Sequence, residues 1–527
     1  MAFMNIIPLS VALELSIITL VAYTLSLTIY RLYFSPLAKF PGPKLAAATW
    51  WYEFYYDVVL RGQYIFHIKE LHERYGPIIR ISPYEIHIYT PSFYDEVYAV
   101  SNRKRDRWAW STRPGGFGLS IGGTNAHDLH RMRRGALAPY FSKANIRRLQ
   151  YAIDEKVMQL VGRLVESKTH GEPFKLNHAF AAFTNDIAME YSFGRNDNRL
   201  AHKEYDPTFH DNFVAGVGQI NLLRHMFWLE KVAKLVPEWL LAKVSSVVAM
   251  FWAEKQAITE QIQQILNGAN KDHLDKEHPT IYHEILGSKL PDQEKSLDRL
   301  AQEAQITIGA GTLATAWTLS VGCFHLLTPE CTPILMKLRA ELLTILPDPD
   351  GKIDLVILER MPYLTACVKE ALRMGNGTST RLQRIAPEET LIFPDPQTGK
   401  EWAIPAGTPV SLSSLLIHRD ESIFQEARKF RPERWLENPG LDRYLLTFSK
   451  GSRQCLGMHL AYAEMYLTMA RVFRAFGTKE LEAAGVKSDF GNIELFETTE
   501  RDVICVADLM VPAVWEGSQG VRIKVTA

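Results

Sequence analysis

Residues 448–457 read FSKGSRQCLG and place a single cysteine, Cys455, in a loop that contains two glycines. Gly451 and Gly457 permit close approach of the backbone to a flat partner, which a Cβ atom would obstruct. Arg453 offers a planar guanidinium for a carboxylate, and the helical pattern after the loop would stabilise a thiolate through its N-terminal N–H groups. A lone cysteine is more commonly a buried structural residue. The ten-residue pattern as a whole favours a ligand-binding thiolate instead.

The pattern F-x-x-G-x-R-x-C-x-G resembles the haem-binding loop of the cytochromes P-450, the haem-thiolate monooxygenases. A haem matches the parts of the loop, because it is flat, carries propionates and holds an iron that accepts a thiolate. The resemblance implies that Cys455 is the axial iron ligand of haem b and that Phe448 and Arg453 bind the cofactor. It covers about residues 35–527 and implies the family's mainly α fold, a helical prism with a small β-rich lobe.

Three further residues are expected to bind the haem propionates. His130 and Arg134 are four positions apart and share one face of a predicted helix that ends near Pro139. A solvated basic face would explain such a pair equally well without other motifs. The family has an aromatic residue or His, followed four positions later by Arg, at this distance before a proline. Arg381, in the sequence RLQR, resembles another propionate-binding arginine of the family.

A structural triad is predicted from two separate motifs. Glu370 and Arg373 form E-x-x-R on a helix, which alone is a weak signal because any helix can carry an i,i+3 ion pair. Arg434 lies in the sequence FRPERW that follows later in the chain. Together the three resemble the family's Glu-Arg-Arg triad, whose role would be to lock the core behind the haem without taking part in the chemistry.

A long helix is predicted over residues 300–327. Gly309 and Gly311 each cost about 1 kcal/mol relative to alanine in a helix, so a kink or a bound group should justify them. The resemblance implies that this helix lies over the iron and carries an acid followed by a threonine. Leu313 and Ala314 occupy those two positions here. The family's usual route for protons to the bound dioxygen is therefore altered.

Thr312 and Thr315 are the nearest hydroxyls and are the candidate distal proton relay. Thr315 lies one residue beyond the usual position, about 100° further round the helix. An ordered water or a substrate hydroxyl can serve instead. Two alternatives to monooxygenase chemistry stay open: a haem-thiolate enzyme that rearranges, dehydrates or couples its substrate without oxygen insertion, and a membrane-tethered haem carrier or sensor without turnover.

Residues 6–30 form an apolar stretch with one charge, Glu14, and about 20 such residues span a membrane. Arg31 and Lys39 follow the stretch and no Lys or Arg precedes it, which places the C-terminal side in the cytosol. A cleaved signal peptide is the alternative, but the basic n-region is missing. We expect a membrane anchor over 1–34, a Pro/Gly-rich hinge over 35–45 and a haem-thiolate catalytic domain over 46–527. The resulting localisation is the endoplasmic reticulum membrane, single-pass, with a cytosolic catalytic domain.

The composition limits the possible partners. The 527 residues carry a formal net charge of +0, so the chain lacks the excess of basic residues that is typical of nucleic-acid-binding proteins. The five cysteines are scattered and include no C-x-x-C pair, which argues against a disulfide framework or a zinc site. The glycines of residues 115–123 do not fit G-x-G-x-x-G, so the chain shows no dinucleotide site. By resemblance this glycine-rich loop would line the substrate pocket.

The resemblance implies electron delivery from NADPH through a separate cytochrome P-450 reductase, or from a cytochrome b5-type donor. Outer arginines near the predicted propionate helix can form a basic docking face for an acidic donor; they are Arg131, Arg133, Arg147 and Arg148. The substrate would be a lipophilic small molecule. The hinge, the pocket loop and the segment after Cys455 look most like fungal secondary-metabolism members of the trichodiene oxygenase type, which suggests a terpenoid.

Two further segments are predicted from pattern alone. Residues 78–82 and 85–89 alternate around Ser82-Pro83 and indicate a β-hairpin. Residues 226–252 are unusually apolar, with lysines interspersed. Ordinary core helices explain this segment as well as an amphipathic lid at a membrane surface does.

Overall fold

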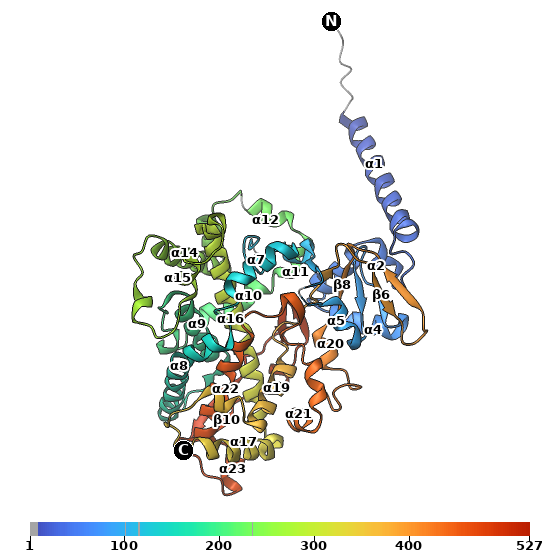
Figure 1. The fold of residues 1–527 in the computed structure, drawn as a ribbon. Helices are drawn as coiled ribbons and strands as arrows, with labels where there is room; N and C mark the ends of the chain where they lie inside the picture. The colour runs from blue at the N-terminus through green and yellow to red at the C-terminus, as the bar shows by residue number, and fades with distance from the viewer. Residues whose placement is uncertain (1–8, 101, 114–115, 234) are drawn as a thin grey trace.

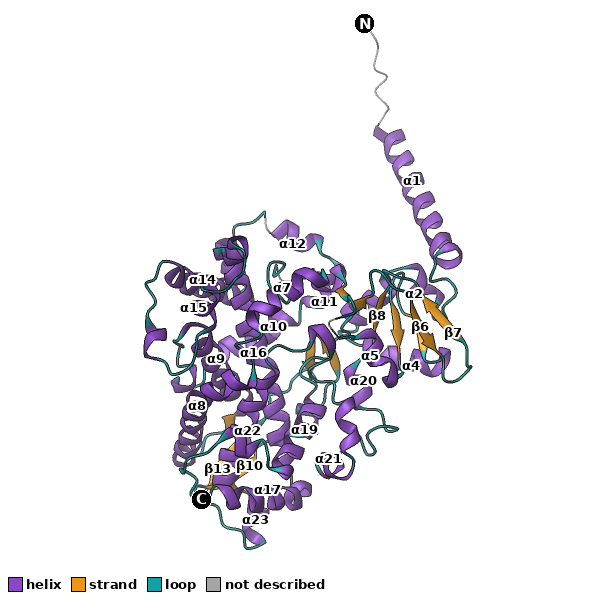
Figure 2. Ribbon diagram, viewed as in Figure 1, coloured by secondary structure: helices purple, strands orange, loops and turns teal. Residues whose placement is uncertain are grey.

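The computed structural model describes residues 9–100, 102–113, 116–233 and 235–527 of the chain. Helices make up most of the body, and strands are seen at the right, at the lower left and near the middle of the view (Figures 1 and 2). The longer helices are α1 (Leu9–Ile29), α4 (Tyr64–Tyr75), α7 (His127–Leu137), α8 (Lys143–His170), α9 (Leu176–Phe193), α10 (Pro207–Val217), α14 (Ser246–Leu266), α16 (Leu297–Leu326), α17 (Thr332–Ile345), α19 (Pro362–Gly375) and α22 (Met458–Ala475). The mainly α prediction with a small β-rich part is therefore confirmed.

Shorter helices connect these elements. They are α2 (Lys44–Ala48), α3 (Trp51–Phe54), α5 (Tyr94–Val97), α6 (Ala109–Thr112), α11 (Ile220–His225), α12 (Trp228–Ala233), α13 (Glu238–Val244), α15 (Ile281–Leu286), α18 (Leu355–Leu358), α20 (Ser414–His418), α21 (Glu433–Glu437) and α23 (Lys479–Ala483).

The strands form four small sheets. The largest has the order β1 (Ile78–Arg80), β2 (Ile86–Ile88), β8 (Pro409–Ser411), β5 (Arg384–Ile385) and β3 (Asp106–Arg107). A second sheet contains β4 (Phe174–Lys175), β13 (Arg522–Thr526), β10 (Gly491–Leu495) and β9 (Phe476–Gly477). Two hairpins pair β6 (Leu391–Pro394) with β7 (Glu401–Ile404) and β11 (Ala507–Leu509) with β12 (Val511–Ala513). The predicted hairpin is confirmed, because β1 and β2 pair antiparallel with Ile78 opposite Ile88.

Helix α16 occupies the centre of the helical part and packs against α9, α14, α19 and α22. Its bounds agree with the predicted helix over 300–327. A Cβ atom at Gly309 would lie 2.9 Å from Phe213 Cζ of α10, and one at Gly311 would lie 3.5 Å from Ala188 Cβ of α9. Close packing of α10 therefore accounts for Gly309, whereas a Cβ atom at Gly311 would make an ordinary van der Waals contact.

Helix α1 stands apart from the body at the upper right of Figure 1. None of its residues is buried, and the segment Leu9–Phe34 has a mean hydropathy of 1.8, so it qualifies as a candidate membrane span. The first residues of the predicted span, 6–8, lie outside the described part. α16 is also long and apolar, but it is mostly buried in the body and serves as a core helix.

The chain leaves α1 through a segment that is packed against the body. The buried Arg80 donates from Nη1 to Arg31 O at 2.7 Å, and its own N–H donates to Pro41 O at 2.7 Å. Gly42 has φ +146°, and a Cβ atom there would collide with Arg80 O. The Pro/Gly-rich connector is therefore fastened to β1.

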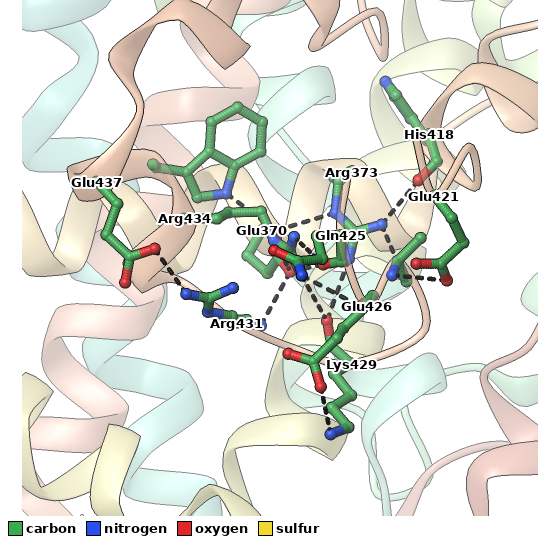
Figure 3. A network of polar contacts seen from close by, with 12 residues as sticks. Glu370, Arg373, His418, Glu421, Gln425, Glu426, Lys429, Arg431, Arg434 and Glu437 are labelled. Carbon is green, nitrogen blue, oxygen red and sulfur yellow. Dashed lines mark hydrogen bonds and ion pairs between the residues drawn. The ribbon is translucent and has the colours of Figure 1, made fainter. Parts of the chain in front are cut away.

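The structure brings Glu370 and Arg373 of α19 together with Arg434 of α21 (Figure 3). Arg373 Nη2 lies 2.8 Å and Arg434 Nε 3.1 Å from Glu370 Oε1, and all three residues are buried. Burial opposes ionisation of Glu370, yet the two arginines hold its pKa below the usual value. Removing one partner of such a buried network typically costs about 3–5 kcal/mol, because the others keep an uncompensated charge.

Candidate active site

The loop before α22 folds back on itself around Cys455. The Cys455 N–H donates to Phe448 O at 2.9 Å, and the Gln454 N–H donates to Gly451 O at 3.1 Å. Gly451 has φ +73°, and a Cβ atom there would collide with the carbonyl oxygens of Tyr98 and Ala99. Glycine is thus required for the turn that presents the cysteine.

The Cys455 side chain is exposed, although the protein body surrounds it closely enough for burial to raise the pKa of its thiol. A hydrogen bond from the Gly457 N–H and the charge of Arg134 act in the opposite direction and lower that pKa. The open space in front of Gly457 agrees with this exposure, since a Cβ atom there would meet nothing within 4 Å. The four other cysteines, Cys323, Cys331, Cys367 and Cys505, are buried.

Helix α7 brings His130 and Arg134 to this loop. Arg134 Nη1 donates to Gln454 O at 2.7 Å, directly beside the cysteine. His130 is buried, and its pKa is lowered to about 2 by burial and by the charges of Arg453, Arg134, Arg107 and Arg384. The imidazole is therefore neutral and faces four guanidinium groups.

Arg453 points away from solvent into backbone carbonyls. It donates to Arg105 O at 3.1 Å, Thr124 O at 2.7 Å and Asn125 O at 2.5 Å. Burial and the nearby charges of Arg384 and Arg107 lower its pKa to about 9. The guanidinium is held rigidly at a site where other cations disfavour its charge.

Two arginines that the sequence did not indicate complete this group. Arg107 on β3 lies directly opposite Arg384 on β5 in antiparallel register. Like charges opposite each other destabilise a strand pair. Burial and the charge of Arg384 lower the pKa of Arg107 to about 10, and burial lowers that of Arg384. We call Arg107, His130, Arg134, Arg384 and Arg453 the cation cradle.

The cradle lacks anions of its own. Within the described residues, none of its members forms an ion pair with a carboxylate. Asp106 acts favourably on Arg453 and Cys455 on Arg134, and the hydroxyls of Tyr94 and Tyr98 act favourably on Arg384. Burying several unpaired cations together is unfavourable unless a bound anionic group compensates them. The two propionates of a haem are such a group, and the exposed thiol of Cys455 is the matching iron ligand. These residues therefore fit a haem.

Arg381 lies elsewhere. Its guanidinium pairs with Glu53 and, at 3.3 Å, with Glu85, both of which are buried. These carboxylates and Asp57 hold the pKa of Arg381 well above its usual value against the effect of burial. The structure thus places Arg384, three positions later, in the cradle and assigns Arg381 to an acidic network. The expectation of a propionate contact from Arg381 is corrected on this ground.

The half-buried ring of Phe448 packs against Tyr462 of α22, with centroids 5.3 Å apart. It also contacts the large helical core. Phe448 therefore fixes the start of the cysteine loop on the helix that follows it.

Helix α16 exposes a small face within an otherwise buried helix. Ala310 is exposed and Ala314 is half-buried, four positions further on the same face. A Cβ atom at Gly377, which follows α19, would lie 3.9 Å from Ala314 Cβ. This face of α16 carries no hydroxyl or acid at either alanine.

Thr312 contacts α9, whereas Thr315 contacts α22 and lies about 100° round the helix from Ala314. Thr312 is fully buried; its hydroxyl donates to Ile308 O at 2.8 Å and accepts from Asn185 Nδ2 of α9 at 3.2 Å. The Thr315 hydroxyl contacts the carboxyl of Glu464 on α22. Burial raises the pKa of Glu464 well above its usual value, a shift that the Thr315 hydrogen bond only partly offsets. Glu464 is therefore a neutral acid beside a threonine hydroxyl.

The predicted basic docking face is smaller than expected. Arg133 is buried and binds Glu294 through two hydrogen bonds of 2.8 and 2.9 Å, so it is not available on the surface. Arg131, Arg147 and Arg148 are exposed. Arg147 pairs with Glu359 at 2.9 Å.

The apolar segment after α10 forms short surface helices. α12 and α13 carry exposed apolar side chains, and Leu235 and Val244 are 83% and 80% exposed. Further exposed members are Phe227, Trp228, Val232, Trp239 and Leu240. α12 lies at the top of the view in Figure 1. We call this group the apolar rim; its exposure disfavours the core-helix interpretation.

Comparison with known proteins identifies the family of the chain. The family model described as Cytochrome P450 matches residues 42–506. Cytochrome P450 monooxygenase astB of Talaromyces wortmannii is 62% identical over 511 residues, which cover 97% of each chain. Cytochrome P450 monooxygenase tpcC of Cochliobolus heterostrophus is 46% identical and covers 99% of this chain and 98% of its own. Tryptophan 6-hydroxylase fscE of Fusarium equiseti is 38% identical, with 97% and 96% covered.

These relatives are fungal, and they span nearly the whole chain. With a family match over most of its length and relatives at up to 62% identity, the chain belongs to the cytochrome P450 family, whose monooxygenases use a haem bound through a cysteine thiolate.

Proposed function

We propose that this monooxygenase inserts one atom of dioxygen into a lipophilic fungal secondary metabolite, in the first instance a terpenoid. The observation that carries the monooxygenase chemistry is the exposed Cys455 thiol facing a cradle of unpaired cations. When bound, the haem supplies the activation of dioxygen, and one oxygen atom goes to the substrate and the other to water. The chain's own residues hold the cofactor, exclude water and deliver protons.

Cys455 is proposed as the axial iron ligand, and the cation cradle as the propionate site. Arg453 is immobilised by three backbone carbonyls, and Arg384 is fixed by its place in β5, so both present donors with little loss of side-chain freedom. Phe448 holds the loop on α22. A preorganised set of this kind binds an anionic group more tightly than mobile surface lysines would.

The face of α16 that carries Ala310 and Ala314, here called the open face, supports an apolar substrate. Ala310 and Ala314 offer no polar group to a ligand. The relative from Fusarium equiseti is named a tryptophan 6-hydroxylase, which favours an aromatic substrate as a second candidate. Terpenoids and indoles both expose C–H bonds on a largely apolar skeleton, so one panel can test the two classes.

Proton delivery is proposed to run through Thr315 and Glu464. Glu464 holds its proton at neutral pH because burial raises its pKa, and its Oε1 has no hydrogen-bond partner. The carboxyl can release that proton to the Thr315 hydroxyl that it contacts, and the hydroxyl can pass its own proton onward. Thr312 is less suited, because its hydroxyl is engaged between Ile308 and Asn185.

Membrane attachment is proposed to use α1 as a single spanning helix, with the catalytic body on the cytosolic face of the endoplasmic reticulum. The exposed apolar side chains of α1 support a lipid environment. The apolar rim would rest on the same membrane and admit lipophilic substrates from it. Arg131, Arg147 and Arg148 would then receive an acidic NADPH-dependent reductase or a cytochrome b5-type donor.

A non-oxygenating reaction is the second candidate, favoured by Leu313 and Ala314 at the positions of the usual acid and threonine. Such an enzyme would rearrange, dehydrate or couple its substrate. It needs no proton donor near bound dioxygen. Isotope labelling separates the two candidates.

The decisive assay supplies membrane-expressed protein with NADPH, a fungal cytochrome P-450 reductase and a panel of terpenoids and indoles under ¹⁸O₂. We expect a substrate-dependent product that contains one ¹⁸O atom per oxidation. A product without ¹⁸O would identify the non-oxygenating enzyme. If the haem is intact and no substrate of the panel is converted with or without NADPH, the result would favour a carrier or sensor.

The cradle assignment predicts different defects for two arginines of the same motif. Arg384→Gln should lower the haem retained per purified chain several-fold while the apoprotein unfolds at an unchanged or higher temperature, because a repulsive pair with Arg107 is removed. Arg381→Gln should lower the unfolding temperature itself, because Glu53 and Glu85 lose their cation. The reverse pattern, with haem loss confined to the second variant, would refute the assignment.

The relay predicts a coupling defect in Thr315→Val. Product formed per NADPH consumed should fall by at least about 10-fold, since a positioned proton donor contributes about 10²–10⁴-fold to rate. The matched control is Thr312→Val, which removes a buried hydroxyl of the same helix and should leave coupling within about 2-fold. Equal effects of both variants would contradict the proposed route.

A further inference from the structure

Two histidines and an aspartate meet between α9 and α10, away from the cysteine loop. Asp211 Oδ1 lies 3.0 Å from His178 Nε2 and 2.9 Å from His210 Nδ1. One ligand atom of each residue lies within 4.8 Å of the others. The two imidazole rings are 4.9 Å apart.

Local structure fixes where the three side chains lie. His178 belongs to the first turn of α9, and His210 and Asp211 belong to the first turns of α10. Asp206 caps α10 by accepting a hydrogen bond from the Phe209 N–H at 3.3 Å. Both helices are therefore anchored at the ends that carry the three groups, and the cluster joins one helix to the other.

We propose that His178, His210 and Asp211 bind one divalent transition-metal ion, with Zn²⁺ as the preferred ion, and so tie α10 to α9. Imidazole nitrogen and carboxylate oxygen are regular zinc ligands, at about 2.0–2.2 Å from the metal. Tetrahedral coordination at that distance separates neighbouring ligand atoms by about 3.3 Å. The observed separations of 2.9 and 3.0 Å from Asp211 Oδ1 are close to this value.

The charges of the cluster suit a cation. Partial burial opposes ionisation of Asp211, yet hydrogen bonds from His178 and His210 hold its pKa well below the usual value. Burial lowers the pKa of His210, so its imidazole is neutral and has a lone pair to give. Metal binding requires each imidazole to carry its proton on the ring nitrogen that does not face Asp211. Lys175 is the nearby cation that acts against binding.

The site has room for a fourth ligand. The side chain of Asp211 is 62% exposed, whereas that of His178 is 8% exposed. A water molecule can therefore complete a tetrahedron from the solvent side. The sequence gave no indication of this site, because its ligands come from separate helices and include no cysteine.

A second trio of possible ligands does not support a metal. Glu53, Asp57 and His225 also lie close together. Arg381 already pairs with Glu53, and the charge of Arg224 acts on both carboxylates. The guanidinium groups of Arg381 and Arg224 thus already compensate the carboxylate charge that a metal ion would compensate there.

The proposed ion would act on the active site through α10. Phe213 of this helix covers Gly309 of α16, where a Cβ atom would come within 2.9 Å of Phe213 Cζ. The same ring contacts Phe251 of α14, with centroids 5.5 Å apart. Gly309 adjoins the exposed Ala310. Fixing α10 to α9 therefore restricts movement of a side chain that borders the open face of α16.

The test measures metal binding directly on haem-loaded, full-length protein without a polyhistidine tag. After removal of metals by a chelator, equilibrium dialysis against Zn²⁺ with elemental analysis gives stoichiometry, and calorimetric titration gives affinity. We expect one tight Zn²⁺ per chain. His210→Asn and Asp211→Asn should each weaken binding by at least about 10-fold, since even outer-shell partners of a metal site change affinity by about 10–100-fold.

The matched control is His202→Asn, which removes an exposed histidine from the connection just before α10 and should leave binding unchanged. Unfolding temperatures in the presence of chelator show whether each variant is folded. Wild-type protein that takes up no stoichiometric Zn²⁺ would overturn the proposal, and so would binding that survives in both ligand variants. Because the readout needs no turnover, its failure is distinct from failure of the proposed monooxygenase function.

Discussion

Mutual repulsion among buried and half-buried arginines is the constraint on which the active site depends. Arg107 and Arg384 are fixed opposite each other by the register of β3 and β5, and Arg453 is fixed by three carbonyls. Such a group is unfavourable without a counter-anion. In the proposed function, a cradle positioned in advance by the fold would bind the haem propionates, and the same propionates would hold the macrocycle over Cys455.

The remaining architecture serves this arrangement. The Glu370 network joins α19 to α21, and α16 carries small residues at Ala310 and Ala314 that would form the distal wall of the proposed site. Protons, in this account, come from a neutral carboxyl on α22 and not from the helix position used elsewhere in the family. In this account, the face of α16 toward the substrate is apolar, and the acid lies on α22 instead of α16.

Local motifs predicted most of this fold, because their signals lie within a few residues. The cysteine loop, the β1–β2 hairpin, α16 and the Glu370–Arg373 pair belong to that class. Arg107 was missed because only strand pairing brings it to Arg384. Arg384 lies three positions after Arg381. In an extended chain, residues three apart point to opposite faces, so a single sequence cannot say which side meets the cofactor. The His178 cluster likewise depends on how two helices pack.

The most direct test of the central claim is the carbon monoxide difference spectrum of the reduced, membrane-expressed protein beside Cys455→Ala. Thiolate ligation donates electron density to the iron and gives the family its strongly red-shifted Soret band. The account predicts that band in the wild-type protein and its loss in a folded Cys455→Ala variant. A folded wild-type protein without the band, or a variant that retains it, would contradict the assignment of Cys455 as the iron ligand.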